Sequence, residues 1–72
     1  MWYTGTKAKC IAYNSMVSNE MGLGTGLTQS WAKVIKHHSK SVFAIAKHPD
    51  YDQDDLTLID ELPSDWFPDE QL

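Results

Sequence analysis

The chain contains no arginine, and only one of its 72 residues is a cysteine, Cys10. Arginine supplies the planar fork that commonly recognises guanine or clamps phosphate, so its absence disfavours direct nucleic-acid binding by the chain. A single cysteine excludes an internal disulfide, and no CxxC pair indicates a zinc or redox site. We therefore expect a protein of a reducing compartment that carries no cofactor.

Long apolar runs are also missing. No run approaches the roughly 18 residues needed to cross a bilayer, and the first residues lack the basic segment and apolar core of a signal peptide. We expect a cytoplasmic protein that binds no membrane. A chain of 72 residues makes one domain, whose core supplies only about 3–5 kcal/mol of stability. The prediction is a single small domain over residues 1–72 with an acidic C-terminal segment over residues 50–72.

The charges are divided along the sequence. Residues 1–49 contain all six lysines and one acid, Glu20, whereas residues 50–72 contain nine acids and no lysine. The first part therefore has a net charge of +5 and the second a net charge of −9. An acidic segment of this kind favours a partner with a basic surface, because charge complementarity speeds and orients association.

Two runs rich in Val, Ile, Trp and Phe, 31–36 and 41–47, predict a central antiparallel hairpin. The turn between them contains no Gly, Asn or Asp, so the tight hairpin turns are not indicated and the register stays open. With a three-residue loop, Trp31 and Ile35 share a face with Phe43 and Ile45, and the small residues on the other face would let a helix dock closely. We favour that register. A two-residue loop exchanges these partners.

Residues 7–19 lack Gly and Pro and predict one amphipathic helix. Thr4 or Thr6 fits its N-cap, and Gly22 fits a left-handed C-cap. Residues 56–60 fit either a third strand or a helical turn. The apolar stripe of the helix follows spacings of three and four, at Cys10, Tyr13 and Val17, and is broadened by Ile11 and Met16. The predicted fold class is α+β, with one N-terminal helix packed on a small antiparallel sheet of about three strands.

Patterns that resemble catalytic or ligand sites have simpler interpretations. Glycines at 22, 24 and 26 lack the Gly-Lys-Ser/Thr of a phosphate loop. His48 would lie some ~20 Å from His37 and His38 along a strand, and adjacent strand residues point to opposite faces, which disfavours a metal site. Cys10 on a helix is a small buried hydrophobe rather than a nucleophile. We predict that the protein is not an enzyme.

The spacing Asp50-x-Asp52-x-Asp54, with Glu61 at the twelfth position, resembles the calcium loop of EF-hands. Asp55 stands where that loop requires glycine for its sharp turn, and Thr57 replaces the usual apolar residue. A calcium-binding module over residues 50–61 is therefore an alternative to an acidic, solvated loop.

Acids and aromatic rings together suggest a surface for a protein partner. Trp66 and Phe67, between two prolines, either fold back on the sheet or anchor a partner, since aromatic anchors dominate interface energetics. The predicted partner-binding residues are Asp50, Asp52, Asp54, Asp55, Asp65, Trp66 and Phe67. We expect a protein partner with a basic surface and no metal site. A small self-associating assembly protein is the second alternative.

Three segments, Met-Trp-Tyr-Thr-Gly at the start, Phe-Ala-Ile-Ala-Lys-His-Pro from residue 43 and Leu-Pro-Ser-Asp-Trp-Phe-Pro from residue 62, give the chain its layout. In this layout, and in its size and acidity, the chain resembles the small accessory proteins encoded by bacteriophages and prophages. The resemblance implies a non-catalytic binder in the bacterial host cytoplasm, often an inhibitor of a host or defence enzyme. The acidic surface extends this to enzymes that handle nucleic acid, because dense carboxylates can take the place of phosphates. The resemblance assigns no functional residue.

Overall fold

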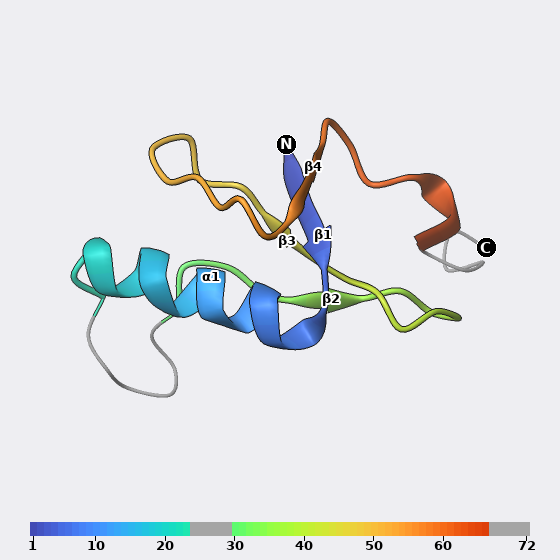
Figure 1. The fold of residues 1–72 in the computed structure, drawn as a ribbon, viewed down its shortest axis with the longest axis horizontal. Coiled ribbons are helices and arrows are strands. Elements are labelled where there is room, and N and C mark those ends of the chain that lie inside the picture. Colours follow the sequence, from blue (N-terminus) through green and yellow to red (C-terminus); the bar gives the residue numbers. More distant parts are fainter. Residues whose placement is uncertain (24–29, 67–72) are drawn as a thin grey trace.

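The structure, a computed structural model, describes residues 1–23 and 30–66. One helix packs on a four-stranded antiparallel sheet (Figure 1). The strands are β1 (Trp2–Gly5), β2 (Ile35–Lys36), β3 (Phe43–Ala46) and β4 (Thr57–Ile59), and their order in the sheet is β2-β3-β1-β4. The predicted α+β class is confirmed. The sheet has four strands rather than about three, because the aromatic N-terminal segment enters it as a central strand.

Helix α1 (Lys7–Glu20) has the predicted caps at both ends. The Thr6 hydroxyl accepts a hydrogen bond from the Lys9 amide at 3.2 Å, which satisfies one of the free amides of the first turn. At the other end Gly22 adopts a φ of 73° and donates to the Asn19 carbonyl at 3.1 Å, while Leu23 donates to the Ser18 carbonyl at 3.0 Å. This pair of bonds is a Schellman motif, which ends the helix and satisfies its last carbonyls.

The core lies between α1 and the sheet. Its buried side chains come from the helix, from the two central strands and from the residue before β4: Cys10, Tyr13, Val17, Tyr3, Ile45 and Leu56. The prediction that Ile11 broadens the buried stripe of the helix is wrong, because 44% of Ile11 is exposed. It lies about 100° around the helix from Cys10, outside the narrow stripe that the small sheet covers. Met16 does pack against the core.

The register of the β2–β3 hairpin differs from the favoured one. Ile35 lies opposite Ala44, so Ile35 faces away from the side of the sheet that carries Ile45. The connection holds residues 37–42 and is closed by a hydrogen bond of 2.9 Å from the His37 amide to the Val42 carbonyl. The even number of loop residues shifts the pairing by one residue, which moves every side chain of one strand to the other face.

Strand β2 is much shorter than the predicted run 31–36. The Trp31 amide donates to the Ser18 hydroxyl at 2.9 Å, and the Ala32 amide donates to the Asn14 side-chain oxygen at 3.2 Å. Polar side chains of α1 therefore hold the backbone at Trp31 and Ala32 beside the helix, where it does not continue strand β2. Local β-propensity is overridden here by a tertiary contact.

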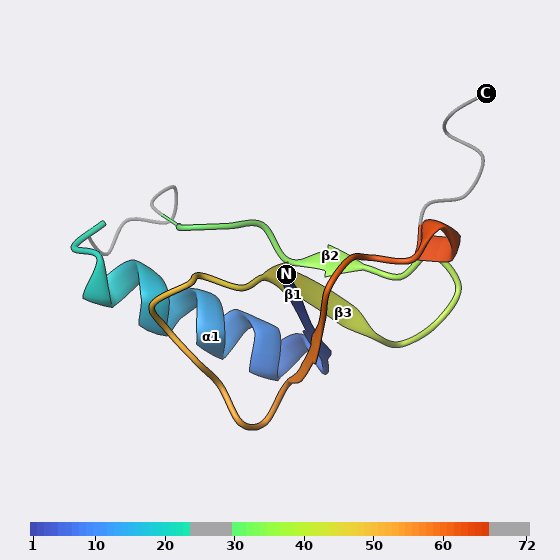
Figure 2. The same ribbon diagram turned by 90° about the horizontal axis from the view of Figure 1, so that it is seen from above.

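Residues 57–59 form strand β4, which decides between the two interpretations left open for this segment. Beyond β4 the chain runs back to the opposite edge of the sheet and forms η1 (Ser64–Trp66), a single 3-10 turn (Figure 2). There the Trp66 ring contacts the ring of His37, with 5.0 Å between ring centroids. Residues 47–66 thus span the molecule rather than forming a compact unit.

Candidate functional site: an acidic loop held by two tyrosines

The acidic loop, which we define as residues 47–55, joins β3 to the segment before β4. It lies at one end of the long axis of the molecule, above α1 (Figure 1). The four aspartates of the loop, Asp50, Asp52, Asp54 and Asp55, are all exposed. Since no regular strand or helix holds this loop, its shape depends on side chains that reach it from the core.

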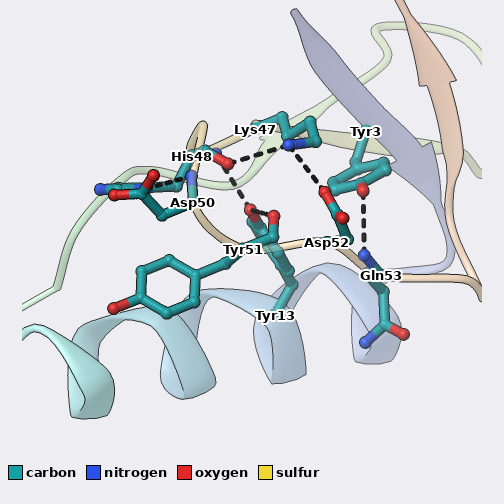
Figure 3. A network of polar contacts seen from close by, with 8 residues as sticks. All are labelled: Tyr3, Tyr13, Lys47, His48, Asp50, Tyr51, Asp52 and Gln53. Carbon is teal, nitrogen blue, oxygen red and sulfur yellow. Dashed lines mark hydrogen bonds and ion pairs between the residues drawn. The ribbon is translucent and has the colours of Figure 1, made fainter.

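The Tyr13 hydroxyl is the first of these anchors (Figure 3). It donates a hydrogen bond to the Tyr51 carbonyl at 2.8 Å and accepts one from the His48 amide at 2.9 Å. Tyr13 itself is completely buried in the core. Burial raises the pKa of its hydroxyl, and the bond from the His48 backbone opposes this rise. One oxygen of the helix therefore fixes two backbone groups of the loop.

The second anchor is the hydroxyl of Tyr3, which accepts a hydrogen bond from the Gln53 amide at 2.9 Å (Figure 3). The rings of Tyr3 and Tyr13 meet edge to face, with centroids 5.1 Å apart, so the two anchors also support one another. The sequence predicts that Tyr13 belongs to the apolar stripe of the helix and makes no such prediction for Tyr3. A buried hydroxyl requires a polar partner, but the sequence alone does not identify it.

Lys47 neutralises one of the four aspartates. Its ammonium group lies 2.9 Å from a carboxylate oxygen of Asp52 and also donates to the His48 carbonyl at 3.0 Å. The bond to Asp52 raises the pKa of Lys47. The remaining carboxylates of the loop, on Asp50, Asp54 and Asp55, make no ion pair with a residue that the structure describes. Three negative charges therefore stay available on the surface of the loop.

The His48 ring lies between two aromatic neighbours at the base of the loop. Its centroid is 4.9 Å from that of Trp31 and 4.9 Å from that of Tyr51. The ring nitrogen Nδ1 of His48 accepts a hydrogen bond from the Asp50 amide at 3.1 Å, and the Tyr51 amide closes a turn on the His48 carbonyl at 3.2 Å. These contacts complete a loop that is held at several points along its length.

The predicted partner-binding residues are not brought together as one surface. Asp65 and Trp66 lie in η1, at the end of the molecule opposite the acidic loop (Figure 1). Trp66 is 6% exposed, so its ring folds back on the protein and is not an exposed anchor. Phe67 lies outside the described residues. Only the four aspartates of the loop, which are near neighbours in sequence, share one location.

His37 lies in the turn between β2 and β3 but is only 3% exposed. Its ring stacks on that of His38 at 4.6 Å, which contradicts the expectation that the two histidines point apart. That expectation assumes strand geometry, whereas the strand ends at Lys36. The burial of His37 could not be predicted from the sequence, because the ring that covers it belongs to Trp66, which is distant in sequence.

Ser39 and Asp65 also meet His37, so the residue types of a catalytic triad are present. Asp65 lies 3.7 Å from Nε2 of His37, and the Ser39 hydroxyl lies 3.4 Å from Nδ1. The Ser39 amide, however, donates to that same Nδ1 at 3.0 Å. The lone pair of Nδ1 that would take the serine proton is therefore already engaged. These contacts hold the turn 37–42 in place and do not activate a nucleophile.

The calcium alternative finds no support in the geometry of residues 50–61. An EF-hand loop lies between two helices, whereas here residues 50–61 follow strand β3 and contain strand β4. Within residues 1–23 and 30–66, no group of three or more His, Cys, Asp or Glu side chains is placed to hold a metal ion. All four aspartates of the loop are exposed, and Asp52 is paired with Lys47.

No protein-family model, no curated protein and no solved structure matches this chain. The resemblance to phage accessory proteins therefore stays a prediction. In the part of the chain that the structure describes, no helix has the length and apolarity required to cross a membrane.

Proposed function

We propose that the protein is a non-catalytic binding module whose acidic loop docks on a basic surface of a partner protein. One observation carries the proposal. Asp50, Asp54 and Asp55 are exposed, and none of them is paired with a lysine or histidine among the described residues. Unpaired charges grouped in this way strengthen the local field and steer an oppositely charged partner.

The anchoring of the loop supports the proposal as well. Binding is weakened when a loop has to be ordered at the interface, by about 0.5–1.5 kcal/mol for each side chain that is immobilised. Hydrogen bonds to Tyr13 and Tyr3 already fix the backbone at His48, Tyr51 and Gln53. The acidic loop therefore presents its carboxylates on a backbone that is ordered before binding.

Basic grooves that bind nucleic acid are one class of surface that fits such a loop, because carboxylates can take the place of phosphates. An inhibitor of a host or defence enzyme, the role implied by the resemblance to phage proteins, is the corresponding biological function. This inhibitor role rests on charge and not on a match of shape. The proposal itself is therefore limited to a partner protein with a basic surface.

Neutralisation of single aspartates tests the proposal. Fluorescence anisotropy with labelled poly-lysine measures the affinity of Asp54→Asn and of its matched control Asp65→Asn, which removes the same charge at the other end of the molecule. We expect Asp54→Asn to weaken binding about two- to fivefold, the range of a surface ion pair, and Asp65→Asn to have little effect. Affinity should also fall as salt rises. Equal losses in both variants, or binding that salt does not change, would contradict a role for the loop.

Self-association is a second candidate, favoured by the polarity of the molecule. Lys36 and Lys40 are exposed at the turn that enters β3, whereas the acidic loop follows the other end of β3. Contact between opposite ends of successive copies would give a head-to-tail assembly. Sedimentation velocity of the protein alone at rising concentration distinguishes it, because only this candidate gives oligomers without a partner.

A further inference from the structure

Strand β4 is at the edge of the sheet. It pairs with β1 on one side, and on its other side no strand lies next to it within the described residues. The side chain of Leu58, at the middle of β4, is 44% exposed. An exposed edge strand offers unpaired amides and carbonyls to any extended segment that approaches it.

The hydrogen bonds of the neighbouring ladder show which backbone groups of β4 face outward. The Lys47 amide donates to the Met1 carbonyl at 3.0 Å, so Met1 directs its backbone groups toward β3. These directions alternate along a strand, so Trp2 and Thr4 direct theirs toward β4. Their partners in β4, Ile59 and Thr57, lie on either side of Leu58. The amide and carbonyl of Leu58 therefore point away from β1, to the open edge.

Acidic residues flank this edge on both sides. Asp54 and Asp55 precede β4, Asp60 and Glu61 follow it, and all four are exposed. Like charges that face one another across a strand pair are unfavourable, so these acids oppose pairing of β4 with β4 of a second copy. They favour an extended segment that carries positive charge at both of its ends.

We propose that β4 is the docking edge for an extended basic segment of the partner protein, which adds to the sheet as a fifth strand. Its backbone pairs with the amide and carbonyl of Leu58, an apolar residue packs on the Leu58 side chain, and lysines or arginines at either end meet the flanking acids. This is recognition by β-strand addition, in which main-chain bonds give affinity and side chains give specificity. The inference rests on the proposed function and names the mode in which the partner binds.

Two peptides of equal charge test the mode of binding. The first has two lysines at each end and Val-Ile-Val between them, and the second has three prolines in place of Val-Ile-Val. Proline lacks the amide that a strand ladder needs. By fluorescence anisotropy we expect the first peptide to bind at least about fivefold more tightly, because main-chain hydrogen bonds contribute to one complex and not to the other.

A variant of the protein tests the same bond from the other side. Leu58→Pro removes the outward amide, a change that edge strands tolerate where the amide faces solvent. Leu58→Thr is the matched control, since it also loses the leucine side chain but keeps the amide. We expect Leu58→Pro to abolish the preference between the two peptides and Leu58→Thr to retain it. A synthetic chain with N-methyl-leucine at position 58 removes the amide proton alone, should the proline variant not fold.

The outcomes separate the inference from the proposed function. Preference for the Val-Ile-Val peptide, lost in Leu58→Pro, together with slower exchange of the Leu58 amide in the complex, supports strand addition. Equal, salt-sensitive binding of both peptides overturns strand addition and leaves the acidic binding module intact. Absence of binding by either peptide to the folded protein overturns both.

Discussion

Removal of the Tyr13 hydroxyl, by Tyr13→Phe, is expected to destabilise the protein far more than loss of one oxygen suggests. The ring is fully buried and would keep its packing, including the edge-to-face contact with Tyr3. Two backbone groups would lose their partner, namely the His48 amide and the Tyr51 carbonyl. Each unsatisfied group costs about 1–3 kcal/mol, and partial access of water reduces this, so we expect a loss of about 2–4 kcal/mol. This loss is a large share of the few kcal/mol, about 3–5, that a core of this size supplies.

Urea unfolding monitored by tryptophan fluorescence measures this loss, and two other tyrosine variants calibrate it. Tyr3→Phe removes one hydrogen bond, that from Gln53, and should cost about 1 kcal/mol. Tyr51→Phe removes a hydroxyl for which no hydrogen bond is found among the described residues, and should cost less than about 0.5 kcal/mol. The slope of the free energy against urea should stay the same in all three variants, because the surface exposed on unfolding hardly changes.

The order of the three losses of stability tests whether the Tyr13 hydroxyl holds the acidic loop. If Tyr13→Phe costs no more than Tyr51→Phe, the Tyr13 hydroxyl does not hold the acidic loop and the account of the site is wrong. Amide exchange provides a local check. Residues 48–53 should exchange faster in Tyr13→Phe, whereas the amides of β1 and β3 should exchange at rates set by global stability.

Two further predictions concern the core. A Cβ at Gly5 would lie 2.5 Å from a methyl carbon of Leu56, so Gly5→Ala should cost about 1–3 kcal/mol in urea unfolding. Leu56→Val in the same chain should recover part of this loss. Equal stability of Gly5→Ala and the unaltered protein would disprove the close contact. Burial raises the pKa of Cys10 and of Tyr13 above their ordinary values of 9.0 and 10.0. The unfolded chain therefore loses these protons first, and stability should fall as pH rises above about 9. A flat profile of stability from pH 8 to 11 would refute the burial of both groups.

The helix is the element that the sequence determined by itself. Its caps are local, since Thr6 binds an amide three residues ahead and Gly22 takes a conformation that other residues rarely adopt. Its buried stripe at Cys10, Tyr13 and Val17 follows from spacing alone. The acidity of residues 50–55 is likewise a property of adjacent residues, which no fold could separate widely. Interactions over a few residues are enough to specify such features.

Tertiary structure decided the pairing of the strands and the location of the C-terminal residues. The sequence of the β2–β3 turn allows either register of the hairpin, and only the folded chain selects one. Asn14 and Ser18 of α1 bind the backbone at Trp31 and Ala32, where the sequence predicts a longer β2. Trp66 lies on His37 because the chain crosses back to the far edge of the sheet after β4. Each of these contacts joins segments that are distant in sequence, so no local pattern encodes it.

The candidate site shows the same division. The sequence determined that the acidic loop would carry four aspartates next to one lysine-bearing strand end. Only the folded chain decided that Tyr3 and Tyr13 hold the loop, that Lys47 neutralises Asp52, and that Leu58 directs its backbone to an open edge. The physical reason is that charge is a property of each residue, whereas hydrogen-bond partners and strand neighbours exist only when distant parts of the chain meet.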